Sequence, residues 1–142
     1  MNNETVSMLV KKATEARERS YSPYSGFAVG AALLCSDGTV YTGANIENAS
    51  YTPTICAERV AFFQAVHEGH LNFTAIAIVG GSKGSPIESF CTPCGVCRQV
   101  MAEFCNEDFR IILGNANRQT AYSLQELFPL SFSPRDLKGD CV

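Results

Sequence analysis

The chain has 142 residues, of which 46% are hydrophobic and 18% are charged. This length is typical of one domain, and the composition argues against disordered, collagen-like and simple coiled-coil chains. Eleven Lys and Arg stand against 14 Asp and Glu, and neither sign forms a long block. A nucleic acid polymer is therefore not expected as a partner. We expect a single globular domain over residues 1–142.

The first 20 residues contain four basic side chains but no continuous apolar segment, and nowhere do about 18 apolar residues run together. We therefore expect a cytoplasmic protein that does not associate with a membrane. An odd number of cysteines, seven, argues against a disulfide scaffold, and in a reducing compartment cysteines are buried, nucleophilic or metal-binding. The seven are Cys35, Cys56, Cys91, Cys94, Cys97, Cys105 and Cys141.

The apolar periodicity predicts alternating helices and strands along the chain. The predicted helices cover residues 4–19, 56–68, 94–105 and 123–128. The predicted strands cover residues 27–35, 39–44, 73–79, 109–113 and 120–122. The first two strands flank Asp37-Gly38, which predicts a hairpin. The helix at 56–68 is expected to be largely buried through Ala57, Val60, Ala61, Phe63 and Ala65. This order predicts an α/β fold of three layers, α/β/α, around a mixed sheet of about five strands.

Three cysteines stand where two predicted helices begin. Cys94 and Cys97 are three residues apart, so they share one face of a helix and can reach one ion. Cys56 begins the other buried helix, and the exposed N–H groups of two helix N-termini lower thiol pKa values. Three thiolates with an open fourth position are typical of a catalytic zinc. Buried apolar thiols, a closed structural zinc site and Cys91 as a rival ligand are the alternatives.

Glu58 follows Cys56 by two residues, which gives the pattern C-x-E followed by P-C-x-x-C. In zinc deaminases this signature pairs metal ligands with a Glu that acts as general acid and base. On these residues the chain resembles cytidine deaminases of the small homotetrameric type, over nearly its whole length. The motifs that carry the resemblance are Tyr21-Ser22-Pro23-Tyr24-Ser25, Val29-Gly30-Ala31-Ala32-Leu33-Leu34, Asn45-Ile46-Glu47-Asn48-Ala49, Cys56-Ala57-Glu58-Arg59 and Pro93-Cys94-Gly95-Val96-Cys97-Arg98-Gln99.

The resemblance implies a zinc ion bound by Cys56, Cys94 and Cys97, with Glu58 as proton shuttle. The implied reaction is hydrolytic loss of the C4 amino group of cytidine and 2′-deoxycytidine in pyrimidine salvage, by attack of zinc-bound hydroxide. Three thiolates donate more charge to zinc than neutral imidazoles do, which keeps the pKa of bound water high. Arg59 is expected to offset this charge by hydrogen-bonding ligand sulfurs.

The resemblance also implies a nucleoside site shared between the subunits of a homotetramer. Phe27 is expected to pack on the pyrimidine, and Asn45 and Glu47 to hold the ribose hydroxyls. Phe132 and Tyr51 are expected to reach the nucleoside of a neighbouring subunit. The expected substrate contacts are Phe27, Asn45, Glu47, Ala49, Tyr51, Ala57 and Phe132.

Other functions remain open at this point. Ala28 and residues 52–55 depart from the family pattern, which leaves the substrate preference open and a nucleoside antibiotic as an alternative. A base in RNA or DNA fits an acidic chain without a basic stripe poorly. A non-catalytic zinc module is the third alternative, and it would have no use for Glu58. Cys35 is expected in the core, no role is assigned to Cys105 and Cys141, and His67 and His70 are expected to be solvated without a role.

Overall fold

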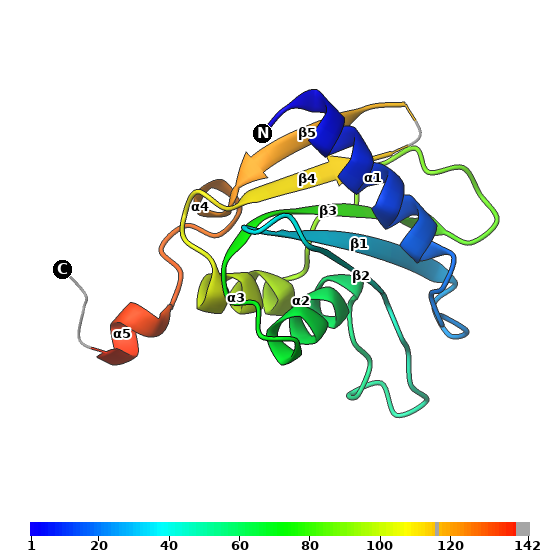
Figure 1. Cartoon of the computed structure of the whole chain (residues 1–142). Helices are drawn as coiled ribbons and strands as arrows, with labels where there is room; N and C mark the ends of the chain where they lie inside the picture. Colours follow the sequence, from blue (N-terminus) through cyan, green and yellow to red (C-terminus); the bar gives the residue numbers. More distant parts are fainter. Residues whose placement is uncertain (116, 139–142) are drawn as a thin grey trace.

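The computed structural model describes residues 1–115 and 117–138 (Figure 1). The helices are α1 (Asn3–Arg17), α2 (Ala57–His67), α3 (Gly95–Phe104), α4 (Leu124–Leu127) and α5 (Pro134–Lys138). The strands are β1 (Phe27–Cys35), β2 (Val40–Ala44), β3 (Phe73–Ser82), β4 (Arg110–Gly114) and β5 (Gln119–Ser123).

The five strands form one mixed sheet in the order β2-β1-β3-β4-β5. Only β3 and β4 are parallel, and α3 connects them, as a crossover between parallel strands requires. The other neighbours are antiparallel, including β1 and β2, which form the hairpin predicted around Asp37-Gly38. The predicted fold class is confirmed, with all five strands at the expected places.

Helices cover both faces of the sheet: α1 lies on one face and α2 and α3 lie together on the other (Figure 1). Alternate strand residues point to opposite faces. On β3, Ile76 and Ile78 join the core under α2 and α3, whereas Ala75 and Ala77 join the core under α1. The smaller side chains let α1 pack close to the sheet, and the larger ones fill the space beside α2 and α3.

One glycine sets how closely α2 packs on the sheet. A Cβ at Gly43 of β2 would lie 2.4 Å from the backbone oxygen of Ala57 and 2.7 Å from the backbone nitrogen of Ala61. Real Cβ contacts are not this short, so the first turn of α2 rests directly on the β2 backbone. This contact fixes the N-terminus of α2 relative to the hairpin.

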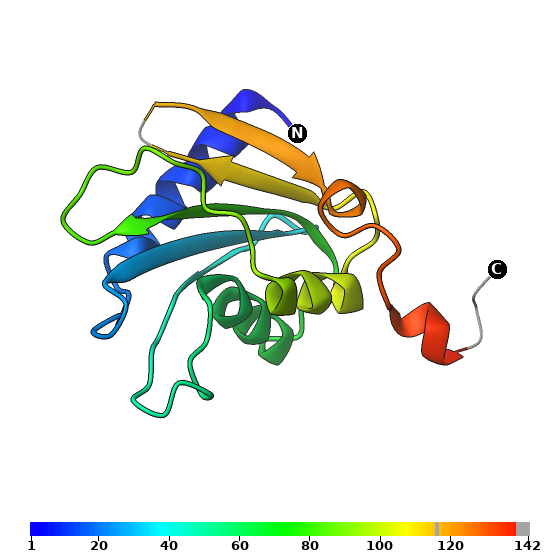
Figure 2. The ribbon, with the colours of Figure 1, turned by 180° about the vertical axis from the view of Figure 1, so that it is seen from behind.

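The boundaries of the predicted elements agree with the structure to within about three residues. Two other points differ from the prediction. Phe63 was predicted to be buried, but it is exposed, and Phe62 is fully buried instead. The buried face of α2 repeats through Ala57, Ala61 and Ala65, and Phe63 points about 100° away from Phe62. The sequence did not predict α5, a short helix that stands apart from the sheet (Figure 2). In the described part of the chain, no helix has the length and apolar character needed to span a membrane.

His70 is the second correction at residue level, because it is part of a hydrogen-bonded group rather than solvated alone. Its Nδ1 lies 3.1 Å from the Tyr41 hydroxyl and its Nε2 lies 3.1 Å from the Asp37 carboxylate. The group connects the turn of the β1-β2 hairpin to the segment after α2. The side chain of Cys35 is buried in the core, as predicted.

Candidate active site and metal centre

Two helices begin at the centre of the candidate site. Cys56 is the N-cap of α2 and Cys94 is the N-cap of α3, and neither side chain caps its own helix. The N–H groups of both first turns therefore face the same region as the two sulfurs, with the positive end of each helix dipole. This confirms the prediction that both cysteines stand at helix N-termini.

The structure brings the three predicted thiols together. The Sγ atoms of Cys56, Cys94 and Cys97 all lie within 4.8 Å of one another, and those of Cys56 and Cys94 are 3.6 Å apart. A hydrogen bond with Cys97 lowers the pKa of the Cys56 thiol to about 5, and Arg59 acts in the same direction. Such a thiol is readily deprotonated, as a metal ligand must be.

Glu58 lies in the first turn of α2 and is 3% exposed, which is unusual for a carboxylic acid. Burial raises its pKa to about 7, and the proximity of Cys56 adds to the rise. A carboxyl group with this pKa can both accept and donate a proton near neutral pH. The position is the one predicted for a proton shuttle beside the thiols.

Arg59 donates from Nη2 to the Sγ of Cys56 over 3.4 Å. The Arg59 side chain is half-buried and its Nε is fully buried, so the contact is only partly screened by solvent. It brings a positive charge to the thiol group, in the manner predicted from the sequence.

A backbone pair connects the residues after β2 to the thiol site. Ile46 and Ile55 exchange two hydrogen bonds of 3.0 Å, which places the segment around Asn45 and Glu47 next to Cys56. Two of the predicted nucleoside contacts, Asn45 and Glu47, therefore lie beside the segment that carries the predicted ligand Cys56.

The Asn45 side chain holds the start of β1. Its Oδ1 accepts from the backbone N–H of Val29 over 2.9 Å and from the Ser20 hydroxyl over 2.5 Å. Its Nδ2 donates to the backbone carbonyl of Phe27 over 2.8 Å. The amide therefore keeps one N–H without a partner among the described residues.

The Glu47 carboxylate is held by the turn before β1. Its Oε1 accepts from the backbone N–H groups of Tyr24 and Ser25, at 2.9 and 3.1 Å. Its Oε2 accepts from the Ser25 hydroxyl over 2.5 Å. This hydroxyl is the main reason why the pKa of Glu47 is lowered. Ser20 and Ser25 have no role predicted from the sequence, although Ser25 is in a motif that carries the family resemblance.

The other predicted contact residues differ in accessibility. Phe27 is 41% exposed at the start of β1, and Tyr51 is 69% exposed, with an edge contact to the Tyr24 ring. Ala49 is exposed, whereas the Ala57 side chain is fully buried in the core, which leaves only its backbone for a ligand. Phe132 is 56% exposed, and its carbonyl accepts a hydrogen bond from Gln99 of α3.

Cys91 is not part of the three-thiol group, so the structure does not favour it as a rival ligand. It packs against Gly80 of β3, and burial raises its pKa to about 12. Burial also raises the pKa of Cys105, and Cys141 lies outside the described residues. The side chains of Cys35, Asp37 and His70 form a second group close enough for a metal, but both His70 nitrogens already have hydrogen-bond partners.

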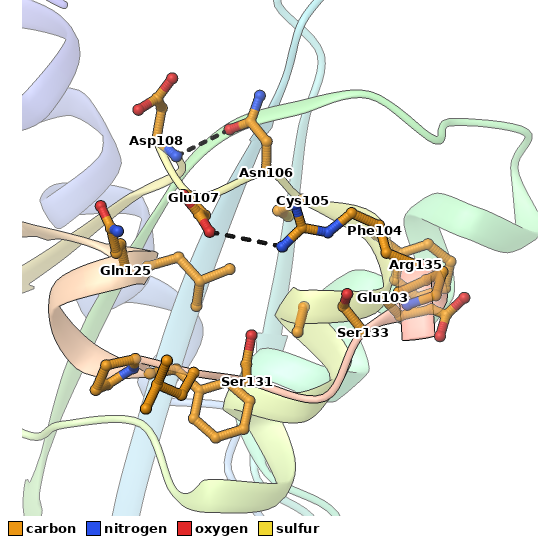
Figure 3. Close-up of a pocket in the computed structure, with 16 residues that line it drawn as sticks. Glu103, Phe104, Cys105, Asn106, Glu107, Asp108, Gln125, Ser131, Ser133 and Arg135 are labelled. Carbon is orange, nitrogen blue, oxygen red and sulfur yellow. Dashed lines mark hydrogen bonds and ion pairs between the residues drawn. The ribbon is translucent and has the colours of Figure 1, made fainter. Parts of the chain in front are cut away.

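A hollow of about 710 Å³ lies elsewhere, between the end of α3 and residues 124–135. Figure 3 shows its polar rim, where the Arg135 guanidinium lies 3.8 Å from the Glu107 carboxylate. Its lining includes none of the residues predicted for the metal or the nucleoside. We therefore place the candidate site at the thiols rather than in this hollow.

Residues 3–113 match the family model described as the cytidine and deoxycytidylate deaminase zinc-binding region. The fold and the three-thiol group thus define a zinc-dependent deaminase domain. The chain is 47% identical to the cytidine deaminase of Sporosarcina psychrophila over 93% of this chain and 94% of that protein. It is 50% identical to that of Halalkalibacterium halodurans over 92% and 96%.

Solved structures agree with these relatives. The cytidine deaminase of Burkholderia pseudomallei is 43% identical with a TM-score of 0.79, over 93% of this chain and all of that chain. The Mycobacterium tuberculosis enzyme is 40% identical with a TM-score of 0.75, over 89% and 96%. The chain belongs to the cytidine deaminase family.

Proposed function

We propose that this protein is a zinc-dependent cytidine deaminase, which hydrolyses the C4 amino group of cytidine and of 2′-deoxycytidine in pyrimidine salvage. The observation that carries the proposal is the buried carboxylic acid of Glu58 beside the three-thiol group. A purely structural zinc site needs no acid there, and burial of an unused carboxylate is unfavourable. Residues 1–142 then form one catalytic domain in the cytoplasm.

The three thiols fit a zinc ion. Their donor set is soft, and their separations allow one ion to reach all three sulfurs. We assign Cys56, Cys94 and Cys97 as the ligands, with Arg59 neutralising part of the thiolate charge. When bound, zinc supplies Lewis-acid chemistry that lowers the pKa of water.

Glu58 carries the proton transfers of this mechanism. Its carboxylate accepts a proton from the attacking water and passes it to ring N3, so that C4 becomes electrophilic. Glu58 then takes the proton of the new C4 hydroxyl and delivers it to the amino group, so that the C4 carbonyl forms, the C4–N bond breaks and ammonia leaves. A pKa near neutrality lets one carboxyl group serve both directions of transfer.

Asn45 and Glu47 each keep one hydrogen-bonding position that no described residue uses. This supports the proposal that together they bind one sugar hydroxyl. Counting partners within residues 1–115 and 117–138, Asn45 has one N–H left and Glu47 has one acceptor position left on Oε2. A hydroxyl can accept one hydrogen bond and donate another. One sugar hydroxyl would therefore use both the free N–H of Asn45 and the free acceptor position of Glu47. If it is the 3′-hydroxyl, ribose and 2′-deoxyribose satisfy the site equally.

We also propose that the active enzyme is a homotetramer in which neighbouring subunits contribute to each site. Leu130, Phe132 and Leu137 are exposed apolar side chains on the carboxy-terminal segment that stands apart from the sheet (Figure 2). Exposed apolar side chains grouped in this way are typical of an interface. Phe132 then packs over the nucleoside of the next subunit, and Tyr51 makes a second contact of this kind.

The test is ammonia release from cytidine, 2′-deoxycytidine, blasticidin S and a cytosine-containing oligonucleotide, with the zinc content measured. We expect release from the first two only, with one zinc per chain. Glu58→Gln should lower kcat by at least about 10²-fold while zinc is retained, because a positioned acid–base group contributes about 10²–10⁴-fold. Full activity of Glu58→Gln would refute its role, and zinc without turnover of any substrate would indicate a binding module.

A further inference from the structure

The Ser25 hydroxyl bridges two of the proposed nucleoside contacts. It donates to Oε2 of Glu47 over 2.5 Å, and it accepts from the backbone N–H of Phe27 over 3.0 Å. One hydroxyl therefore connects the carboxylate next to β2 with the aromatic residue that begins β1. The backbone N–H of Ser25 donates to the other oxygen of the same carboxylate.

We propose that Ser25 is a positioning residue for the sugar, which directs the one free acceptor position of Glu47 and sets its distance from the Phe27 ring. The proposal rests on the proposed function, in which Glu47 binds a sugar hydroxyl and Phe27 packs on the base. Ser25 itself does not touch the substrate in this arrangement.

The hydrogen bonds of the Glu47 carboxylate explain why the Ser25 hydroxyl, rather than the backbone, has the positioning role. Two backbone N–H groups fix Oε1, but among the described residues only the Ser25 hydroxyl defines the direction of Oε2. Without that donor, Oε2 keeps two open acceptor positions, and water can occupy either. The turn itself is expected to survive, since its backbone bonds from Tyr24 and Ser25 to Glu47 and from Gly26 to Ser22 do not involve this hydroxyl.

The size of the effect follows from the charge of the acceptor. A hydrogen bond to a charged group contributes about 1.5–3 kcal/mol, which corresponds to about 10–150-fold in an equilibrium constant. We therefore expect Ser25→Ala to lower kcat/KM for 2′-deoxycytidine by about tenfold to hundredfold, mainly through KM. Ser25→Thr retains the hydroxyl and should stay within about threefold of the parent protein.

The experiment compares two substrates that differ in the sugar hydroxyl, 2′-deoxycytidine and 2′,3′-dideoxycytidine. The zinc content and the melting temperature of each variant are measured in parallel. Ser25→Ala should affect the dideoxy substrate less than about threefold, because that substrate has no 3′-hydroxyl for Glu47 to bind. Ser85→Ala, in the exposed loop at 83–86, is the matched control and should behave like the parent protein on both substrates.

Glu47→Gln separates the two levels of the proposal. If Glu47→Gln discriminates between the substrates and Ser25→Ala does not, the inference about Ser25 is wrong and the proposed sugar site stands. If Glu47→Gln affects both substrates equally, the proposed sugar site is wrong and the inference fails with it. The double variant should be no worse than Glu47→Gln alone, because both substitutions remove the same interaction.

Discussion

The burial and the hydrogen bonds of single residues in this site cannot be predicted from the residues next to them in the sequence. Glu58 is charged by type, yet it is buried on the same face of α2 as Phe62, one helical turn away. Asn45 and Glu47 use most of their hydrogen-bonding capacity within the protein, so they arrive at a ligand already oriented. Preorganised polar groups of this kind lose less entropy when they bind.

Arg59 offers a test of how the thiolate charge is balanced. We expect Arg59→Gln to weaken zinc binding by about 10–100-fold and to lower the activity, because the Cys56 sulfur loses a charged donor. Competition with a chelator of known affinity measures the zinc affinity.

Two controls accompany this variant. Circular dichroism should show an unchanged fold, since Arg59 as a whole is only half-buried and Gln retains a polar side chain there. Arg19→Gln, at an exposed arginine after α1, should bind zinc like the parent protein. Equal zinc affinity and activity of Arg59→Gln and the parent would remove the role proposed for this side chain.

Among the elements, the position of α2 on the sheet decides whether the site forms. Its N-cap is Cys56, its first turn holds Ala57 and Glu58, and its backbone rests on Gly43 of β2. A shift of α2 therefore moves a proposed metal ligand and the proposed proton shuttle together.

Gly43→Ala tests this dependence. The added methyl group would meet the backbone of Ala57 and Ala61, which no rotamer change can relieve. We expect a loss of about 1–3 kcal/mol in the free energy of unfolding, as is typical of overpacking, together with a lower zinc content. Urea denaturation and metal analysis measure the two effects.

Gly81→Ala in β3 is the matched control, because a Cβ there makes only an ordinary contact of 3.5 Å with Ile87. It should retain zinc and lose little stability. If Gly43→Ala were as stable and as rich in zinc as Gly81→Ala, the close contact of α2 with β2 would not position the site.

At the scale of the whole molecule, the carboxy-terminal segment exposes apolar side chains that the rest of the described chain does not cover. It carries exposed apolar side chains at Leu130 and Phe132, and α5 stands away from the sheet (Figure 2). A surface of this kind gains stability when a second copy covers it.

Mixing two inactive variants tests whether subunits share sites. Glu58→Gln lacks the proposed proton shuttle, and Phe132→Ala lacks the side chain proposed to reach the neighbouring subunit. Random assortment in an oligomer leaves about a quarter of the sites with both residues intact, so activity should reappear after denaturation and joint refolding. If the activity of the mixture does not exceed the sum of the separately refolded variants, Glu58 and Phe132 belong to the same subunit's site. If light scattering shows a monomer, the proposed tetramer is wrong.

Much of this protein was predictable from local patterns. Hydrophobic periodicity and turn residues depend on neighbours in the chain, and they predicted five strands, four helices and the hairpin at Asp37-Gly38. The spacing of Cys94 and Cys97 predicted that these two thiols can share one ion, because helix geometry relates residues a few positions apart. The roles of Cys56 and Glu58 came from the resemblance to cytidine deaminases, and the tertiary structure brings Cys56 to the other two thiols.

The tertiary structure alone decided what depends on contacts between distant segments. It selected Phe62 over Phe63 for the core, gave His70 its two partners, and placed the Ser25 hydroxyl between Glu47 and Phe27. These outcomes require segments about 20 or more residues apart to meet at hydrogen-bond distance or in one core. Local sequence patterns carry no information about such distances, since they are set by how the helices pack on the completed sheet.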